Sequence, residues 1–167
     1  MSTLLALAES IEQTRVGMAI AESRYAFPVI EGVHLIGLSI SVGLIFLTDL
    51  RLMGLLFRHV PVSDVIHQLR AYVLGGFVLV FVSGGLLFWS EASMLIESPA
   101  FPFKLLFMLL AGLNALYFEL VLAKQNAVQE NRPLLPRNVK YAGAASLVLW
   151  TLVIICGRLI PYLPHWA

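Results

Sequence analysis

Four apolar runs separated by polar connections are the feature that most constrains how this chain of 167 residues can fold. About 20 helical residues cross the roughly 30 Å of hydrocarbon in a bilayer, and each run is long enough to do so. Inside lipid the backbone amides must bond within their own segment, so runs of this kind form helices. The predicted spans cover residues 27–48, 71–90, 103–123 and 141–160.

Residues 2–22 precede these runs and show a different pattern. Leu4 and Ile11 fall on one helical face, while Glu9 and Glu12 fall mostly on the other. Such an amphipathic helix is too polar to cross a bilayer, so we expect it to lie in the interface or to pack on the ends of its own bundle. The predicted fold class is therefore an all-α integral membrane protein. A four-transmembrane-helix bundle follows an interfacial N-terminal helix in one domain.

Composition supports this class and excludes others. The chain is 59% hydrophobic and 13% charged, whereas about a quarter of the residues in a soluble domain are charged. A net charge of +1 argues against binding to nucleic acid through a basic face. The single cysteine, Cys156, excludes an internal disulfide and a Cys-pair metal site. Because the first residues lack a basic region, we expect the first span to direct membrane insertion.

The distribution of basic residues predicts an orientation. Seven of the eleven Lys and Arg residues lie in the connections 49–70 and 124–140. The positive-inside rule places these connections in the cytoplasm and both termini outside. We therefore expect a multi-pass protein of the bacterial inner membrane with periplasmic termini. The seven residues are Arg51, Arg58, Arg70, Lys124, Arg132, Arg137 and Lys140.

Glu31 and His34 stand out inside the first span, where ionisable side chains usually mark a functional site. Three positions separate them, so they share a helix face. His34 could be an axial ligand to a b-type haem. The pair could also bind a non-haem metal, although di-iron bundles need a second Glu-x-x-His and this chain lacks one. A proton relay and a simple hydrogen bond to a neighbouring helix remain as the third and fourth interpretations.

Two cations belong to the same outer half of the predicted bundle. Lys104 opens the third span and Arg158 lies near the end of the fourth. They could neutralise haem propionates, pair with Glu31 or extend to the membrane surface. Small residues near the depth of His34 admit either a flat cofactor or close packing between helices, and they permit a homo-oligomer. Those in the first two spans include Gly32, Gly37, Gly75, Gly76, Gly84 and Gly85.

The opposite ends of the spans carry a second set of charges. Asp49 and Arg51 mark the cytoplasmic exit of the first span, and we interpret this segment as an anchoring and packing motif. Glu119, near the end of the third span, is expected to pair with Arg51 or Arg70.

The pattern H-x8-G-x6-L-R, which starts at His34 and ends at Arg51, resembles the first helix of a loose superfamily. That superfamily includes the copper-resistance D-type membrane proteins and the J-type protoporphyrinogen oxidases. The chain also resembles small uncharacterised bacterial membrane proteins with the motifs FP-x-IE-x-xH and DLRL-x-G, over roughly Phe27–Glu119. In the J-type oxidases, a first-helix histidine and a lysine that opens a later helix are associated with haem b. The resemblance therefore implies such roles for His34 and Lys104.

The leading hypothesis is an integral membrane b-type haem protein with His34 as the axial ligand near the outer face. Glu31 would orient the imidazole or tune its basicity. Lys104 and Arg158 would interact with the propionates, or one of them would act as a second axial ligand or a substrate-side group. The role would be electron transfer or a haem-dependent redox reaction with a quinone or another redox partner. As an enzyme, the protein would be a membrane oxidoreductase. The alternatives are a small metal-handling or transport protein and a cofactor-free structural bundle.

Overall fold

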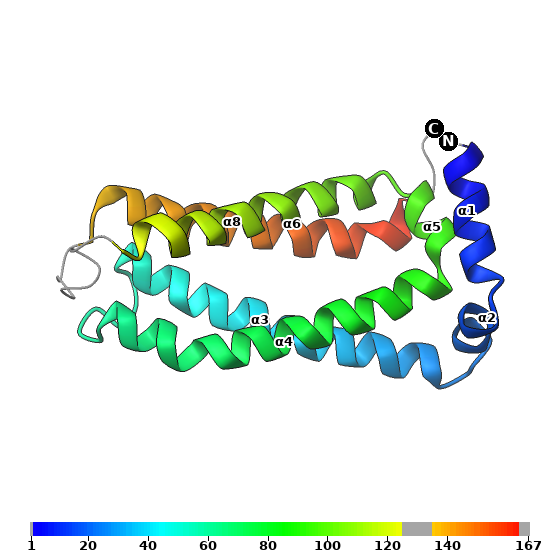
Figure 1. The fold of residues 1–167 in the computed structure, drawn as a ribbon, viewed down its shortest axis with the longest axis horizontal. Helices are drawn as coiled ribbons and strands as arrows, with labels where there is room; N and C mark the ends of the chain where they lie inside the picture. The colour runs from blue at the N-terminus through cyan, green and yellow to red at the C-terminus, as the bar shows by residue number, and fades with distance from the viewer. Residues whose placement is uncertain (1, 125–134, 164–167) are drawn as a thin grey trace.

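The computed structural model describes residues 2–124 and 135–163, so the predicted loop residue Arg132 lies outside the described part of the chain. The described elements are helical, and the long ones run side by side (Figure 1). In chain order they are α1 (Ser2–Glu12), α2 (Arg15–Ala21), α3 (Ala26–Met53), α4 (Val62–Ser90), α5 (Ala92–Glu97), α6 (Ala100–Tyr117), the π-helical turn η1 (Phe118–Leu122), α8 (Arg137–Leu159) and the 3₁₀ turn η2 (Ile160–Tyr162).

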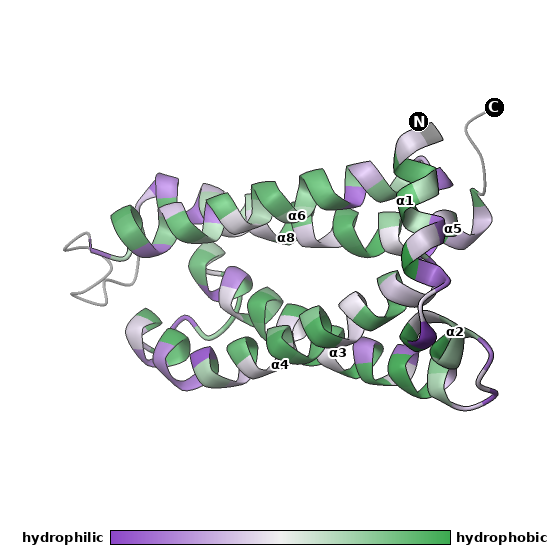
Figure 2. Cartoon of the chain, turned by 45° about the vertical axis from the view of Figure 1, so that its right-hand side comes forward, coloured by the Kyte–Doolittle hydropathy of each residue, from purple (hydrophilic) through white to green (hydrophobic). Residues whose placement is uncertain are grey.

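Among the described residues, four helices are long and apolar enough to cross a membrane: α3, α4, α6 with η1, and α8 with η2. Only 11% to 28% of the residues in their most apolar windows are buried inside the molecule. The remaining apolar side chains face outward, as expected of helices surrounded by lipid. Figure 2 shows that hydrophobic residues dominate along the four long helices. These observations confirm the predicted all-α membrane bundle.

The helices are longer than the predicted spans. The predicted second span begins at residue 71, but α4 begins at Val62. Its first turn buries Val62 and Val65 while Asp64 stays exposed. Because that turn is amphipathic, a search for continuous apolar runs does not detect it. The same holds for α8, which begins at Arg137 and buries Val139.

The N-terminal segment forms two helices that pack across one end of the bundle, beside α4 and α5 (Figure 1). Thr14 separates them and caps α2, because its Oγ1 accepts a hydrogen bond from the Gly17 amide. The indole Nε1 of Trp89 donates to the same oxygen over 2.8 Å. Gly17 packs so closely that an added Cβ would lie 3.0 Å from the Trp89 carbonyl oxygen. The segment therefore packs on the bundle end, which is one of the two placements expected for it.

The antiparallel helices α3 and α4 pack closely at two glycines. A Cβ added to Gly37 would lie 3.0 Å from the Leu79 Cβ, and one added to Gly76 would lie 3.0 Å from the Ser41 amide nitrogen. Only glycine permits so short a distance between helix backbones. The buried Ser41 hydroxyl donates to the Gly37 carbonyl of its own helix, so this polar group is paired at the contact.

The helix α8 completes the bundle by packing on α6 and on the last turns of α3. The Asn114 amide of α6 donates to the Ala142 carbonyl of α8 over 3.0 Å. A Cβ on Gly143 would lie 3.0 Å from the Asp49 carbonyl oxygen, so α3 also approaches α8 closely. An apolar cluster fills the middle of the bundle. Its buried residues are Val42, Ala111, Trp150 and Val153.

We predict that Gly76→Val lowers the free energy of unfolding by about 1–3 kcal/mol, because overpacking forces the two backbones apart. The matched control is Gly75→Val, because an added Cβ at Gly75 has no atom within 4 Å. The control should change stability by less than about 0.5 kcal/mol. Detergent-solubilised protein unfolded with increasing SDS and followed by circular dichroism measures both values. Equal losses for the two variants would contradict the close contact.

Candidate functional site

The imidazole of His34 packs against α4 and bonds to it. Its Nδ1 lies 3.1 Å from the Val80 carbonyl oxygen and 3.0 Å from the Ser83 hydroxyl oxygen. A Cβ added to Gly84 would lie 3.1 Å from the His34 Cε1 atom, so glycine at this position makes room for the ring. His34 lies one helical turn before Gly37 on the same helix, so the close α3–α4 contact brings it within reach of these partners.

The bonding partners of Nδ1 determine the tautomer of a neutral His34. The Val80 carbonyl can only accept a hydrogen bond. The Ser83 hydroxyl donates its own hydrogen to the Leu79 carbonyl, so its oxygen is the acceptor toward His34. Both partners therefore require the proton on Nδ1, which leaves Nε2 with a free electron pair. An imidazole whose Nδ1–H is held by a carbonyl is the usual arrangement of a histidine that binds a metal.

Lys104 lies near His34, and Cys156 lies near Lys104. We call the set His34, Ser83, Lys104 and Cys156 the His34 layer. The Lys104 side chain is half-buried and extends from α6 toward α8, where its Nζ would be 3.5 Å from a Cβ added to Gly157. It lies within electrostatic range of both His34 and Cys156. The amine therefore packs against α8 near Gly157.

Glu31 is exposed on α3 and lies within electrostatic range of His34. The described residues hold no hydrogen bond between the two side chains, because both imidazole contacts come from α4. The hydrogen bonds that orient the imidazole come from Val80 and Ser83 and not from Glu31, while the role of Glu31 in tuning the basicity of the ring stays a prediction. Glu31 contributes negative charge near the ring.

Arg158 is engaged with its own helix end. One of its terminal nitrogens donates to the Tyr162 hydroxyl over 3.2 Å, and its guanidinium carbon lies 5.4 Å from the centre of the Tyr162 ring. Within residues 2–124 and 135–163 it forms no ion pair with Glu31.

At the opposite end of the bundle, Arg70 and Glu119 form an ion pair over 3.2 Å, which confirms the predicted pairing of Glu119 with Arg51 or Arg70.

Sequence reasoning missed Ser83 as a partner of His34. Its position just before Gly84, at the depth expected for His34, was the available signal. The Val80 contact involves a backbone carbonyl, which no residue type reveals.

Among the described residues, no group of three His, Cys, Asp or Glu side chains could hold a metal ion. That finding gives no support to a carboxylate-rich metal site.

A groove of about 130 Å³ lies beside Ser83 and is otherwise lined by apolar side chains of α3 and α4. Pockets that bind whole cofactors or drug-sized ligands usually hold about 300–1,000 Å³. The groove therefore has room for an acyl-chain segment and is too small for a porphyrin.

Carboxylates gather where the N-terminal helices meet the bundle. Both oxygens of Glu12 accept hydrogen bonds from Ser93, one from its amide over 2.7 Å and one from its hydroxyl over 2.8 Å. This contact joins α1 to α5. Burial raises the pKa of the neighbouring Glu91 carboxyl, and the negative charges of Glu31 and Glu12 raise it further.

We predict that neutral His34 carries its proton on Nδ1. Nitrogen NMR of protein labelled with ¹⁵N-histidine, in lipid nanodiscs, distinguishes the two tautomers by their ring shifts. The resonance is assigned by its loss in His34→Ala, with the exposed His67→Gln as the matched control. Protonation on Nε2 instead would contradict the hydrogen bonds to Val80 and Ser83.

We also predict that Glu91 makes the folded protein less stable as pH rises. Its pKa in the folded state is above the ordinary value of 4.5, so the folded state binds more protons than the unfolded state in the interval above pH 4.5. The stabilising contribution of the protonated Glu91 carboxyl is complete below that interval and is lost as pH rises through the raised pKa. Melting temperatures across this interval should show a smaller decline for Glu91→Gln than for the wild type. The exposed-residue control Glu9→Gln should follow the wild type, and an unchanged slope in Glu91→Gln would refute the assignment.

Comparison with known proteins identifies the family of the chain and goes no further. No curated protein and no solved structure matches it. A family model described as "Family of unknown function (DUF6644)" matches residues 14–163. This range includes Thr14 and Gly17, which contact Trp89, and all four long helices. This match agrees with the expected membership in an uncharacterised family. The chain belongs to the family of unknown function DUF6644.

Proposed function

We propose that this chain is an integral membrane b-type haem-binding protein in which His34 supplies an axial ligand through Nε2. The observation that carries the proposal is the pair of hydrogen bonds from Nδ1–H to Val80 and Ser83, at 3.1 and 3.0 Å. These bonds orient the ring, increase its basicity and leave Nε2 as the only free electron-pair donor of the ring. One histidine on a rigid helix is sufficient for an axial position, whereas other metal centres need several ligands.

The remaining predicted residues fit this group by their charge, although the groove beside Ser83 is too small to enclose a porphyrin. Lys104 and Arg158 would hold the propionates through charge-assisted hydrogen bonds. Gly84 leaves the imidazole free of a side-chain clash, and Glu31 adds negative charge that stabilises a more positive centre. Haem b, when bound, would supply a one-electron redox centre. The protein's own groups hold the imidazole in one orientation and surround it with apolar helices.

Further support comes from the sequence pattern that begins at His34 and ends at Arg51, which resembles the first helix of the J-type oxidases and copper-resistance D-type proteins. The role we propose is electron transfer or a haem-dependent redox reaction, with a quinone or another membrane partner. The basic residues near the ends of α3, α4, α6 and α8 support a location in a bacterial inner membrane with periplasmic termini.

A cofactor-free structural bundle is the second candidate. The same contacts favour it, because the bonds of His34 to Val80 and Ser83 join α3 to α4 without any bound group. Under this alternative His34 contributes to stability alone. The two candidates differ in one measurable property, which is the optical spectrum of the purified protein.

We predict that protein purified from membranes of cells supplied with a haem precursor shows a Soret band and the reduced bands of a b-type haem. His34→Ala should lose these bands because its iron ligand is gone, and a pyridine haemochrome assay gives the haem content of each variant. His67→Ala is the matched control, because this exposed histidine lies at the other end of α4. It should retain the wild-type haem content.

Two results would overturn the haem proposal. The first is the lack of a Soret band both in the purified protein and after titration with hemin. The second is a band of equal intensity in His34→Ala. A loss of thermal stability in His34→Ala, together with a featureless wild-type spectrum, would establish the structural role instead.

A further inference from the structure

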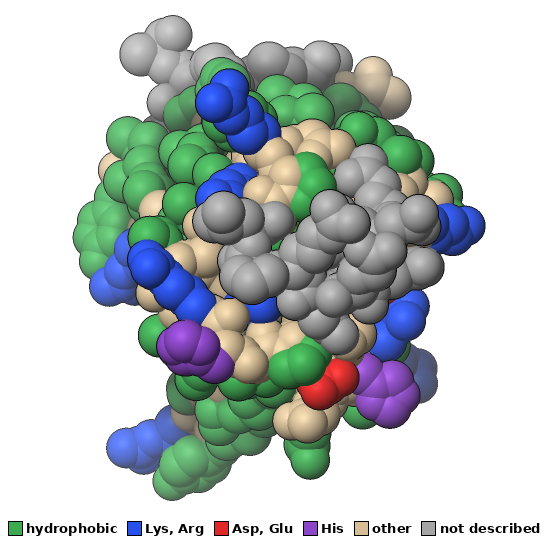
Figure 3. All heavy atoms as spheres, turned by 90° about the vertical axis from the view of Figure 1, so that its left-hand side faces the viewer, with side chains coloured by type: hydrophobic (Ala, Val, Ile, Leu, Met, Phe, Trp, Pro, Cys, Tyr) green, Lys and Arg blue, Asp and Glu red, His purple; other side chains and the backbone are tan. Residues whose placement is uncertain are grey.

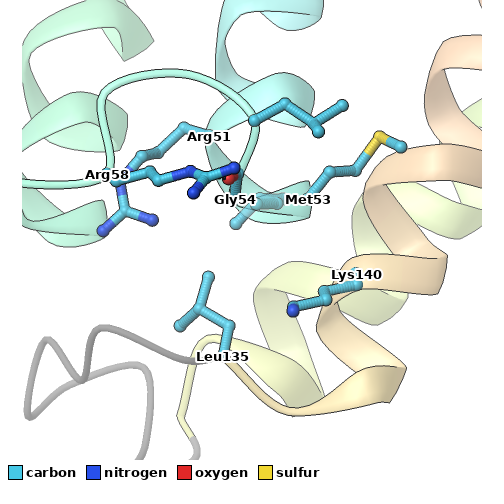
Figure 4. A pocket seen from close by; sticks show the side chains of 8 residues that line it. Arg51, Met53, Gly54, Arg58, Leu135 and Lys140 are labelled. Carbon is cyan, nitrogen blue, oxygen red and sulfur yellow. Dashed lines mark hydrogen bonds between the residues drawn. The ribbon is translucent and has the colours of Figure 1, made fainter.

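A pocket lined by three cations lies at the opposite end of the molecule from the His34 layer. It holds about 200 Å³, and its walls include Arg51, Arg58 and Lys140 together with apolar residues such as Leu52 and Leu135. We call it the basic pocket. Figure 4 shows Arg51 and Arg58 beside the loop that leaves α3, and Lys140 on α8. Seen from this end, Figure 3 shows far more basic than acidic side chains on the surface.

Arg51 is the residue that makes this pocket unusual. It is only 2% exposed and is the largest fully buried side chain of the described chain. Its Nε donates to the Val60 carbonyl over 2.8 Å, which holds the guanidinium in place. A carbonyl satisfies one donor but does not neutralise the charge. A buried guanidinium without a counter-charge is strongly unfavourable.

The described carboxylates do not supply that counter-charge. Within residues 2–124 and 135–163 the only ion pair is the one between Arg70 and Glu119, so no described carboxylate lies within 4.0 Å of a cation of the basic pocket. Asp49 is buried two residues before Arg51, but its Oδ2 atom has no hydrogen-bond partner and its carboxyl group forms no ion pair with Arg51 within the described residues. The pocket therefore has three positive charges and no described negative partner.

The pocket geometry suits a small oxyanion. Arg58 donates its Nε to the Gly54 carbonyl, and Gly54 ends α3 in the left-handed conformation with φ of +75°. This turn brings the Arg58 side chain back over the end of α3, next to Arg51. Guanidinium groups bind phosphate oxygens through paired hydrogen bonds, and a lysine adds a point charge. The volume is below the roughly 300 Å³ of pockets for whole ligands, so a headgroup-sized anion fits best.

We propose that the basic pocket binds a phosphate group, with Arg51 as the buried anchor and Arg58 and Lys140 as the flanking cations. Two sources carry this chemistry: the headgroup of an anionic phospholipid and a free phosphate ion. Basic pockets at the ends of transmembrane helices bind lipid headgroups in this way. The proposal is independent of haem binding, because it concerns the other end of the bundle.

The test compares the two sources on the purified full-length chain. Inorganic phosphate is titrated in detergent, and phosphatidylglycerol is titrated in phosphatidylcholine nanodiscs. Bound molecules are counted by native mass spectrometry, and the melting temperature is followed at each step. We expect one bound phosphate group per chain and a rise in melting temperature with at least one probe. Binding of the lipid alone identifies a headgroup site, and binding of both probes identifies a site that reads the phosphate itself.

The variants use the two flanking cations, because both are at least partly exposed and their replacement leaves the buried Arg51 in place. The double variant Arg58→Gln with Lys140→Gln should weaken binding about tenfold or more. Arg137→Gln is the matched control: Arg137 is exposed on the first turn of α8, three residues before Lys140, and does not line the pocket. It should weaken binding by less than about twofold. Equal losses in the control, or no binding of either probe to the wild type, would overturn the proposal.

Discussion

The close contact between α3 and α4 determines where the polar groups of the first helix pair lie. Gly37 and Gly76 bring the two backbones so near that side chains cannot separate them. In an antiparallel pair, one such contact also sets the register of every residue on either side. His34, one turn away, consequently meets the Val80 carbonyl and Ser83. The tautomer of His34, and with it the candidate ligand atom, is therefore a consequence of backbone packing between two glycines.

The two ends of the bundle differ in charge and in how their charged groups are satisfied. At the end covered by α1, α2 and α5, Glu12 is held by Ser93, and Glu91 lies near two other carboxylates. At the opposite end, Arg51 is buried within a group of cations. Lys104 lies at the first end, within electrostatic range of His34. An apolar cluster lies between the two ends and separates their charged groups.

The long helices were predictable because hydropathy is a local property of the sequence, and membrane spans depend on little else. The site was predictable only in part. His34 and Lys104 could be named, but the partners of His34 depend on which glycines of two helices face each other. Gly37, Gly76 and Gly84 make close contacts, whereas added Cβ atoms at Gly32, Gly75 and Gly85 would have no atom within 4 Å. Nothing in the residue types separates these two groups. Arg51 could be interpreted only as part of an anchoring motif. Its Nε donates to the Val60 carbonyl, which lies beyond the turn at Gly54, and residue types do not reveal that contact.

The π-helical turn at the end of α6 has a consequence for how this helix can vary in length. Phe118–Leu122 contains a bond from the Ala123 amide to the Phe118 carbonyl, five residues back, so the segment holds one residue more than a regular α-helix would. A helical residue turns the chain by about 100°. Removal of one residue here would restore a regular helix and rotate its last turn relative to the body of α6. Leu122 lies on the turn that would rotate. Asn114 could then keep its hydrogen bond to the Ala142 carbonyl of α8 only if Leu122 left its buried position. The length of this segment is therefore constrained more strictly than the identity of its side chains.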